Sequence, residues 1–160
     1  MLNRPEKDKS YSNTFNKYIM LKSVFHPGSV SGPGNIALLL LRLTAGILML
    51  THGMGKLNLL LGSEPIAFPD PLGVGATASL ALTVFAEVFC SVLLILGLAT
   101  RLSVIPLIIT MLVAFFIIHS ADPLSAKELP LFYLVIYVAL GIAGAGQYSI
   151  DHPLYKKMNR

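Results

Sequence analysis

Charged residues are scarce in this sequence of 160 residues. They make up 12% of the chain, against about a quarter in a soluble domain, while 54% of the residues are hydrophobic. A water-soluble domain of this length could not bury so much apolar surface. The charges crowd into the first thirty residues and the last ten, and long stretches between Asn35 and Ile150 are nearly uncharged. This distribution indicates that lipid surrounds the middle of the chain.

Cysteine is almost absent. Cys90 is the single cysteine, and it stands in an apolar run. An intramolecular disulfide and a dithiol relay of the CxxC kind are therefore excluded, so redox chemistry would need a bound cofactor or a partner protein. The sequence also lacks any resemblance to a base-reading module. The formal net charge of +4 therefore does not indicate a nucleic-acid partner, since most basic residues flank hydrophobic segments.

Four long hydrophobic segments are the main feature of the sequence. They run from about Ile36 to Leu57, Ala76 to Leu98, Leu102 to His119 and Leu129 to Ala145. Each approaches or exceeds the roughly 20 residues with which a helix crosses the hydrocarbon core. Helices are required, because an open strand would leave backbone polar groups unpaired in lipid. The sequence thus predicts an all-α four-helix transmembrane bundle over residues 35–150, between an N-terminal tail of residues 1–34 and a basic C-terminal tail of residues 151–160.

Lysine and arginine are distributed unequally between the two sides that these spans define. One side has only Lys56 and Lys127. The opposite side, which includes both chain ends, would carry Arg4, Lys7, Lys9, Lys17, Lys22, Arg101, Lys156, Lys157 and Arg160. Basic loops remain cytoplasmic. Both termini are therefore predicted to be cytoplasmic, with Arg101 as a topological or structural residue in a short inner turn, and the two longer loops to face outward.

The N-terminal tail permits two interpretations. Aromatic and apolar residues between Tyr11 and Phe25 recur at helical spacing, which favours an amphipathic helix on the membrane surface. A poorly ordered basic tail that only sets the topology explains the same residues equally well.

Two charged residues fall deep within the predicted spans. Arg42 lies about seven residues inside the cytoplasmic end of the first span, and Glu87 lies near the middle of the second. A charge at such a depth costs about 2.5–3.5 kcal/mol on insertion scales, so it usually faces the bundle interior and has a partner. Their depths differ by only a turn or two, which predicts a buried Arg42–Glu87 ion pair. Alternatively, Arg42 extends to the cytoplasmic surface and Glu87 is protonated.

Further ionisable residues gather at the outer ends of the spans. His52 and Lys56 are four residues apart in THGMGK and share a helix face, and His119 ends the third span at a similar depth. With Glu87 they predict a polar site in the outer half of the bundle, for ligand binding or proton relay. The alternative is that His52, Lys56 and His119 only reach lipid headgroups. Two histidines across a bundle can ligate haem, but no third ligand is evident, so neither haem nor another metal is expected.

Several motifs together resemble the DoxX family of small bacterial four-helix membrane proteins. They are LLRLTAGILMLTHGMGKL from Leu40, Glu87, LILGLATRL from Leu94, the helix that ends in FFIIHS, and GAGQYSID from Gly144. The resemblance implies a multi-pass protein of the bacterial cytoplasmic membrane, associated with redox systems that include quinone-linked ones. The family's recurring polar positions match Arg42, His52, Lys56, Glu87, Arg101 and His119. One position departs from the pattern, since Gln147 replaces an arginine expected before YSID.

Three functions are compatible with these features. The first is a membrane subunit of a quinone-linked oxidoreductase, which binds quinone among Arg42, His52, Lys56, Glu87 and His119 and receives electrons from a protein partner. The second is a non-enzymatic assembly or scaffold protein, in which the buried charges fix helix register. The third, ranked last, is a small-solute transporter, which would need to form a homo-oligomer because four helices enclose little space.

Overall fold

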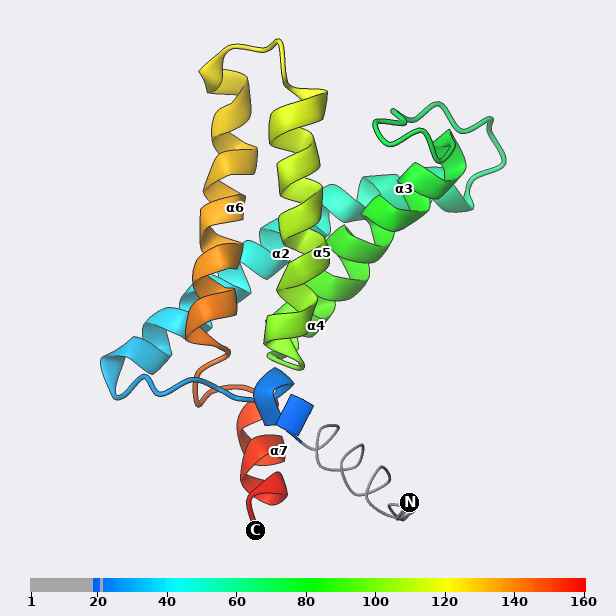
Figure 1. Ribbon diagram of the computed structural model, residues 1–160. Helices are drawn as coiled ribbons and strands as arrows, with labels where there is room; N and C mark the ends of the chain where they lie inside the picture. Colours follow the sequence, from blue (N-terminus) through cyan, green and yellow to red (C-terminus); the bar gives the residue numbers. More distant parts are fainter. Residues whose placement is uncertain (1–18, 21) are drawn as a thin grey trace, which may run out of the picture.

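The computed structural model describes residues 19–20 and 22–160. In chain order its helices are α2 (Pro33–Leu61), α3 (Ala76–Val84), η1 (Phe85–Cys90), α4 (Ser91–Leu96), α5 (Thr100–Val113), η2 (Ala114–Ile118), α6 (Leu124–Ala143) and α7 (Asp151–Met158). Both η1 and η2 are π-helical segments. The described residues contain no strand, and the predicted all-α fold is confirmed (Figure 1).

The predicted spans are also confirmed. Four helices are long and apolar enough to cross a membrane: Pro33–Leu61, Ala76–Leu96, Thr100–Ile118 and Leu124–Ala143. The second span runs continuously through α3, η1 and α4, and the third through α5 and η2. The largest difference from the sequence prediction is at α6, which begins five residues earlier than expected. Its first turn is polar, and hydropathy does not distinguish such a turn from a loop.

Helix α2 is longer than a perpendicular crossing needs. Its 29 residues extend for about 43 Å at 1.5 Å per residue, compared with a hydrocarbon core of about 30 Å. Figure 1 shows α2 running obliquely behind α5 and α6, which stand side by side and antiparallel. A tilted helix accommodates this excess length.

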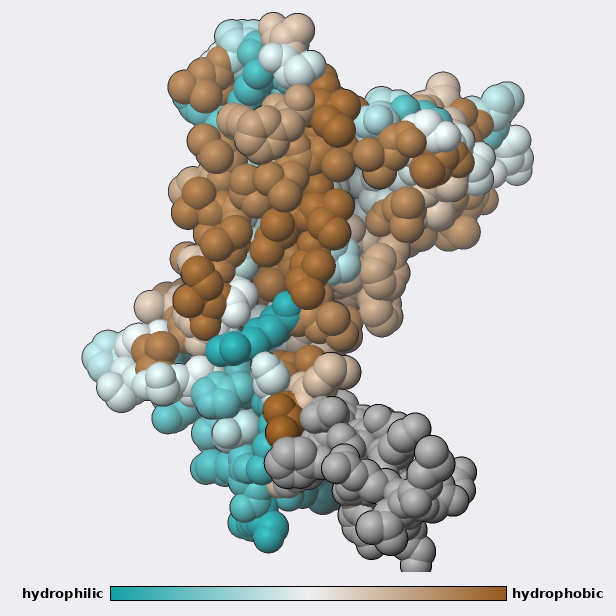
Figure 2. All heavy atoms as spheres, in the orientation of Figure 1, coloured by the Kyte–Doolittle hydropathy of each residue, from teal (hydrophilic) through white to brown (hydrophobic). Residues whose placement is uncertain are grey.

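The helices enclose a small apolar core and leave most large apolar side chains exposed. Core residues come from all four spans: Ala45, Met49, Cys90, Leu94, Val104, Leu107, Met111, Tyr133, Tyr137 and Leu140. The visible faces of α5 and α6 are covered by hydrophobic residues, with hydrophilic residues gathered above and below them (Figure 2). This banding is typical of a bundle whose outer surface contacts lipid.

The two ends of the bundle differ. The end that the sequence predicts to be cytoplasmic, called the inner end below, carries α7, the segment 22–32 and the turn at residues 97–99 (Figure 1). The opposite end, called the outer end, carries loops 62–75 and 119–123. Helix α7 was not predicted, and it forms within the expected C-terminal tail. Most of the proposed N-terminal amphipathic segment lies outside the described residues.

Candidate functional site

Glu87 forms an ion pair with Lys56. The Lys56 Nζ donates to both carboxylate oxygens, at 2.5 and 2.6 Å, and the Glu87 side chain is 4% exposed. The prediction that Arg42 is the partner of Glu87 is therefore wrong. Lys56 lies near the end of α2, and its long side chain extends to Glu87. Counting residues from the ends of the spans compares only backbone depths, so it does not account for the length of this side chain.

The ion pair lies where α2 and the second span are in close contact. A Cβ atom built on Gly53 would be 2.9 Å from the carbonyl carbon of Glu87 and 3.0 Å from its Cβ. Glycine at this position therefore allows the backbone of α2 to approach Glu87 directly. Glu87 also belongs to the π-helical segment η1, and single π-turns within α-helices occur frequently at functional sites.

A cavity of about 470 Å³ lies beside this pair, in the outer half of the bundle. Its walls come from α3 with η1, from α5 with η2 and from the loop 62–75, and α2 contributes Lys56. The lining residues are Lys56, Phe68, Pro69, Pro71, Leu72, Ser79, Leu82, Thr83, Phe85, Ala86, Glu87, Pro106, Ile109, Thr110, Val113, Ala114, Ile118 and His119. Leu82, Phe85 and Ile109 are also among the exposed apolar residues, so the rim of the cavity faces the lipid.

His119 is the third ionisable residue on the wall of this cavity. It directly follows η2 as its C-cap residue, and its Nδ1 lies 2.7 Å from a carboxylate oxygen of Asp122. That contact occupies one ring nitrogen and fixes the orientation of the imidazole. Nε2 therefore remains for a ligand.

The loop 62–75 is held over the cavity by Asp70. Its carboxylate accepts hydrogen bonds from the backbone N–H groups of Val74 and Gly75 and from the Ser79 hydroxyl, at 2.7–3.0 Å. Chiefly the Ser79 hydroxyl, and next the Gly75 N–H, hold the pKa of Asp70 below its ordinary value. Asp70 thus connects the apolar wall of the loop to the first turn of α3.

His52 lies outside this cavity. Its side chain is exposed, and its ring meets the edge of the Tyr133 ring at a centroid distance of 6.3 Å. Tyr133 in turn stacks on Tyr137, with centroids 5.8 Å apart. Sequence reasoning did not single out these tyrosines. The signal was available, because two hydroxyl-bearing residues stand one turn apart in an apolar span and so share a helix face.

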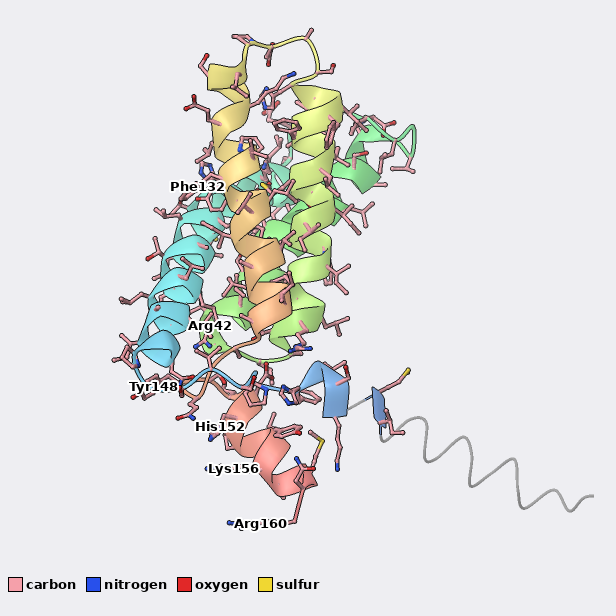
Figure 3. The ribbon with its side chains drawn as sticks, turned by 60° about the vertical axis from the view of Figure 1, so that its left-hand side comes forward. Arg42, Phe132, Tyr148, His152, Lys156 and Arg160 are labelled. Carbon is pink, nitrogen blue, oxygen red and sulfur yellow. The ribbon has the colours of Figure 1, made fainter. Side chains whose placement is uncertain are left out.

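Arg42 belongs to a different cluster, at the inner end. It is 1% exposed, and its guanidinium donates to the carbonyl oxygens of Ala145 and Tyr148. Figure 3 shows Arg42 extending from α2 toward the segment that carries Tyr148. Arg42 therefore neither pairs with Glu87 nor extends to the surface, and it binds the chain that follows α6.

Asp151 completes the inner cluster. Its carboxylate accepts the N–H groups of Ala99 and Thr100, at 2.6 and 3.0 Å, so it caps α5 although it belongs to α7. Ala99 has a left-handed backbone, with φ of 48°. Burial raises the pKa of Asp151, while these N–H donors and the charge of Arg42 act in the opposite direction.

Arg101 also binds a backbone carbonyl at this end. Its guanidinium donates to the Ile142 carbonyl at 3.3 Å, which connects α5 to α6.

Five of the six predicted polar residues thus divide into two groups, and His52 belongs to neither. Lys56, Glu87 and His119 line one cavity in the outer half, whereas Arg42 and Arg101 bind backbone carbonyls at the inner end. Within the described residues, no group of three or more His, Cys, Asp or Glu side chains is arranged to hold a metal ion.

The comparisons with known proteins agree with the fold. The model of the DoxX family matches residues 37–120, which is more than half of the chain. An uncharacterized protein of Haemophilus influenzae is 29% identical over 124 residues, which cover 73% of this chain and 90% of that protein. No solved structure matches. With its four apolar spans and this match, the chain is an integral membrane protein that belongs to the DoxX family.

Proposed function

We propose that this protein binds a quinone in the outer cavity, as the membrane subunit of a redox system. The observation that carries the proposal is the composition of the cavity wall. An apolar enclosure of about 470 Å³, whose rim faces lipid, contains a lysine, a glutamate and a histidine. Its volume lies within the range of about 300–1,000 Å³ that is usual for small-molecule sites.

The three polar residues match the needs of a quinone. A quinone carbonyl requires hydrogen-bond donors, and its reduction requires protons and the stabilisation of negative charge on oxygen. The Lys56 ammonium supplies donors and positive charge, the free His119 nitrogen supplies a second polar contact, and the Glu87 carboxylate accepts or delivers a proton. The hydroxyls of Thr83 and Thr110 already donate to backbone carbonyls and are not counted as donors.

Electrons would come from a partner protein. A quinone supplies the two-electron chemistry when bound, but Cys90 is the only cysteine and is buried, so the chain has no dithiol to pass electrons to it. The family resemblance implies an association with redox systems, which is consistent with a chain that binds the quinone and a partner protein that supplies the electrons.

Fluorescence quenching by a quinone tests the proposal. The chain contains no tryptophan, so a single introduced tryptophan reports its own surroundings. Leu82→Trp places the probe on the cavity rim. Phe132→Trp places it on α6 (Figure 3), at a residue that does not line this cavity. In lipid nanodiscs, decylubiquinone should quench the Leu82→Trp probe saturably and the Phe132→Trp probe only in proportion to its concentration in the lipid.

Variants of the ion pair sharpen this test. Lys56→Met and Glu87→Gln, in the Leu82→Trp background, should weaken quinone binding roughly 10- to 100-fold, because a hydrogen bond to a charged group is worth about 1.5–3 kcal/mol. Lys127→Met and Glu128→Gln make the same chemical changes outside the cavity and should leave binding unchanged. Equal quenching of both probes would show simple partitioning into lipid, and the scaffold function would then be favoured.

A further inference from the structure

The hydroxyl groups on the wall of the outer cavity already donate their protons within the protein. The Ser79 hydroxyl donates to Asp70, the Thr83 hydroxyl to the Ser79 carbonyl, and the Thr110 hydroxyl to the Pro106 carbonyl. A hydroxyl group has one proton, so none of the three has a proton left for a ligand. These groups therefore offer a bound molecule only the lone pairs of their oxygen atoms.

Lys56 retains one donor for a ligand. Its ammonium group has three N–H bonds, and its contacts at 2.5 and 2.6 Å direct it to the two carboxylate oxygens of Glu87. Two of these bonds are therefore engaged, and the third remains for an oxygen atom of a bound molecule. Glu87 itself, as a carboxylate, adds acceptors to the cavity wall and no donor.

Asp122 determines what His119 offers to the cavity. A carboxylate can only accept, so the 2.7 Å contact with Asp122 requires that the proton of the neutral His119 imidazole is on Nδ1. The backbone also holds the pair together, since the Asp122 N–H donates to the His119 carbonyl at 3.0 Å. With its proton on Nδ1, the imidazole has a lone pair on Nε2. Asp122 thus makes Nε2 an acceptor, as the aspartate of a catalytic triad fixes the tautomer of its histidine.

The cavity wall therefore combines one available donor, on Lys56, with several acceptors that include Nε2 of His119. The two redox forms of a quinone differ toward such a wall. The oxidised form has two carbonyl oxygens and can only accept, so it pairs with Lys56 and leaves Nε2 of His119 unpaired. The hydroquinone has two hydroxyl groups, which both accept and donate, so it pairs with both residues. An acceptor left unpaired in a bound complex weakens binding.

We propose that the outer cavity is selective for the hydroquinone form of its ligand, and that Asp122 is the positioning residue that sets this selectivity through His119. One hydroxyl oxygen of the hydroquinone accepts a hydrogen bond from Lys56, and a hydroxyl group donates to Nε2 of His119. This selectivity rests on the proposed function, since the ligand is the one assigned above to the same cavity.

Competition between the two redox forms tests the selectivity. In the Leu82→Trp background, decylubiquinone quenches the probe, and decylubiquinol, a weaker quencher, should restore its fluorescence by displacement. The titration is made in nanodiscs without oxygen, at about pH 8, where an ordinary histidine is uncharged. Decylubiquinol should bind roughly 3- to 10-fold more tightly than decylubiquinone, as expected for one additional hydrogen bond. Equal affinities, or tighter binding of decylubiquinone, would overturn the selectivity.

Two variants connect the selectivity to the pair of Asp122 and His119. The amide of Asp122→Asn can donate to Nδ1, which moves the imidazole proton to Nε2 and turns this nitrogen into a donor. Asp122→Asn should therefore bind decylubiquinol no more tightly than decylubiquinone. His119→Phe removes the acceptor, and it should weaken decylubiquinol binding roughly 3- to 10-fold while leaving decylubiquinone binding unchanged. Glu128→Gln, the matched control, makes the same chemical change as Asp122→Asn at a residue that does not line this cavity, and should keep the parent ratio of affinities.

The ratio of the two affinities separates positioning from a merely structural role. If Asp122 only held the loop 119–123 in place, Asp122→Asn would weaken both redox forms equally, and that result would overturn the proposed role. A parent ratio retained in both Asp122→Asn and His119→Phe would overturn it as well. If decylubiquinone does not quench the Leu82→Trp probe saturably, the proposed function fails and the selectivity with it. Saturable quenching with equal affinities for the two forms contradicts the selectivity alone.

Discussion

Gly97 shows how closely side chains pack at the inner end. Its φ is +66°, and a Cβ atom built there would lie 2.7 Å from the Cζ and Nη1 atoms of Arg42 and 2.6 Å from the Cβ of Ser149. Glycine is therefore needed at this position for two reasons: it adopts the positive φ without strain, and it leaves the space that the Arg42 guanidinium occupies. Arg42 in turn has the Ala145 and Tyr148 carbonyls as acceptors.

We expect Gly97→Ala to destabilise the protein by about 1–3 kcal/mol, through the strained φ and the contact with Arg42. Thermal unfolding in detergent measures the effect. Gly55→Ala is the control, because Gly55 lies within α2 and an added Cβ meets nothing within 4 Å, so this variant should be neutral or slightly stabilising. Equal midpoints for the two variants would contradict the close approach of Arg42 to Gly97.

Single residues also show where the sequence is insufficient. The depths of Arg42 and Glu87 could be counted from the ends of their spans, and both residues are indeed buried. Their directions around the helix axis could not be counted, because π-helical turns such as η1 alter the rotation per residue. The Lys56 side chain also covers several ångströms along the helix. The burial of both residues was therefore predicted correctly, and the partner of Glu87 was not.

At the scale of elements, α5 depends on a cap from elsewhere in the chain. The residue before it, Ala99, has no side-chain acceptor, and Asp151 supplies one from α7. Sequence-based capping rules consider only residues adjacent to a helix. They could not find this cap, and for the same reason they did not predict that the C-terminal segment packs against the turn at residues 97–99.

Asp151→Ala should therefore destabilise the protein by about 0.5–2 kcal/mol, the usual effect of losing an N-terminal cap. Asp151→Asn keeps one acceptor oxygen and should fall between Asp151→Ala and the parent protein. The midpoints of thermal unfolding give this order. An Asp151→Ala variant as stable as the parent would show that α5 does not need the cap.

The loop over the cavity should respond to acid through Asp70. Its pKa is lowered in the folded protein from 3.8, chiefly by the Ser79 hydroxyl. The stabilising contribution is therefore fully present above about pH 4 and is lost as the pH falls through the lowered value.

Hydrogen exchange in the peptide 70–79, corrected for the intrinsic effect of pH, measures this. Protection should be constant from pH 7 to about pH 4 and decrease below that. Asp70→Asn should lose protection at neutral pH, whereas Glu64→Gln, in the same exposed loop, should not. Parent-like protection in Asp70→Asn would contradict the role of Asp70.

At the scale of the whole molecule, hydropathy was sufficient for the fold. The four spans follow from apolar runs of the required length. In lipid these runs must be helical, because a helix pairs its own backbone polar groups and an open strand does not. The cavity could not be predicted in this way. It is lined by residues from three spans and a loop, and most of them are ordinary apolar side chains, such as Leu82, Ile109 and Phe68. Only their arrangement in the folded chain forms the cavity.

The orientation of the molecule remains a prediction. Segment 22–32 and α7 share the inner end of the bundle (Figure 1), and the basic residues predict that this end is cytoplasmic. In a Cys90→Ala background, a single cysteine at Glu64 should react with a membrane-impermeant maleimide in intact spheroplasts. A cysteine at Asn159 should react only after lysis. The reverse pattern would contradict the predicted topology.

The central claim is that a quinone occupies the cavity beside Lys56 and Glu87. A photoreactive azidoquinone, activated in membranes that contain the parent protein and followed by peptide mass spectrometry, tests it most directly. The account predicts adducts on residues 79–87 and 106–119, which excess decylubiquinone suppresses and which decrease in Glu87→Gln. Adducts spread over the lipid-facing sides of all four spans, and unaffected by the competitor, would contradict it.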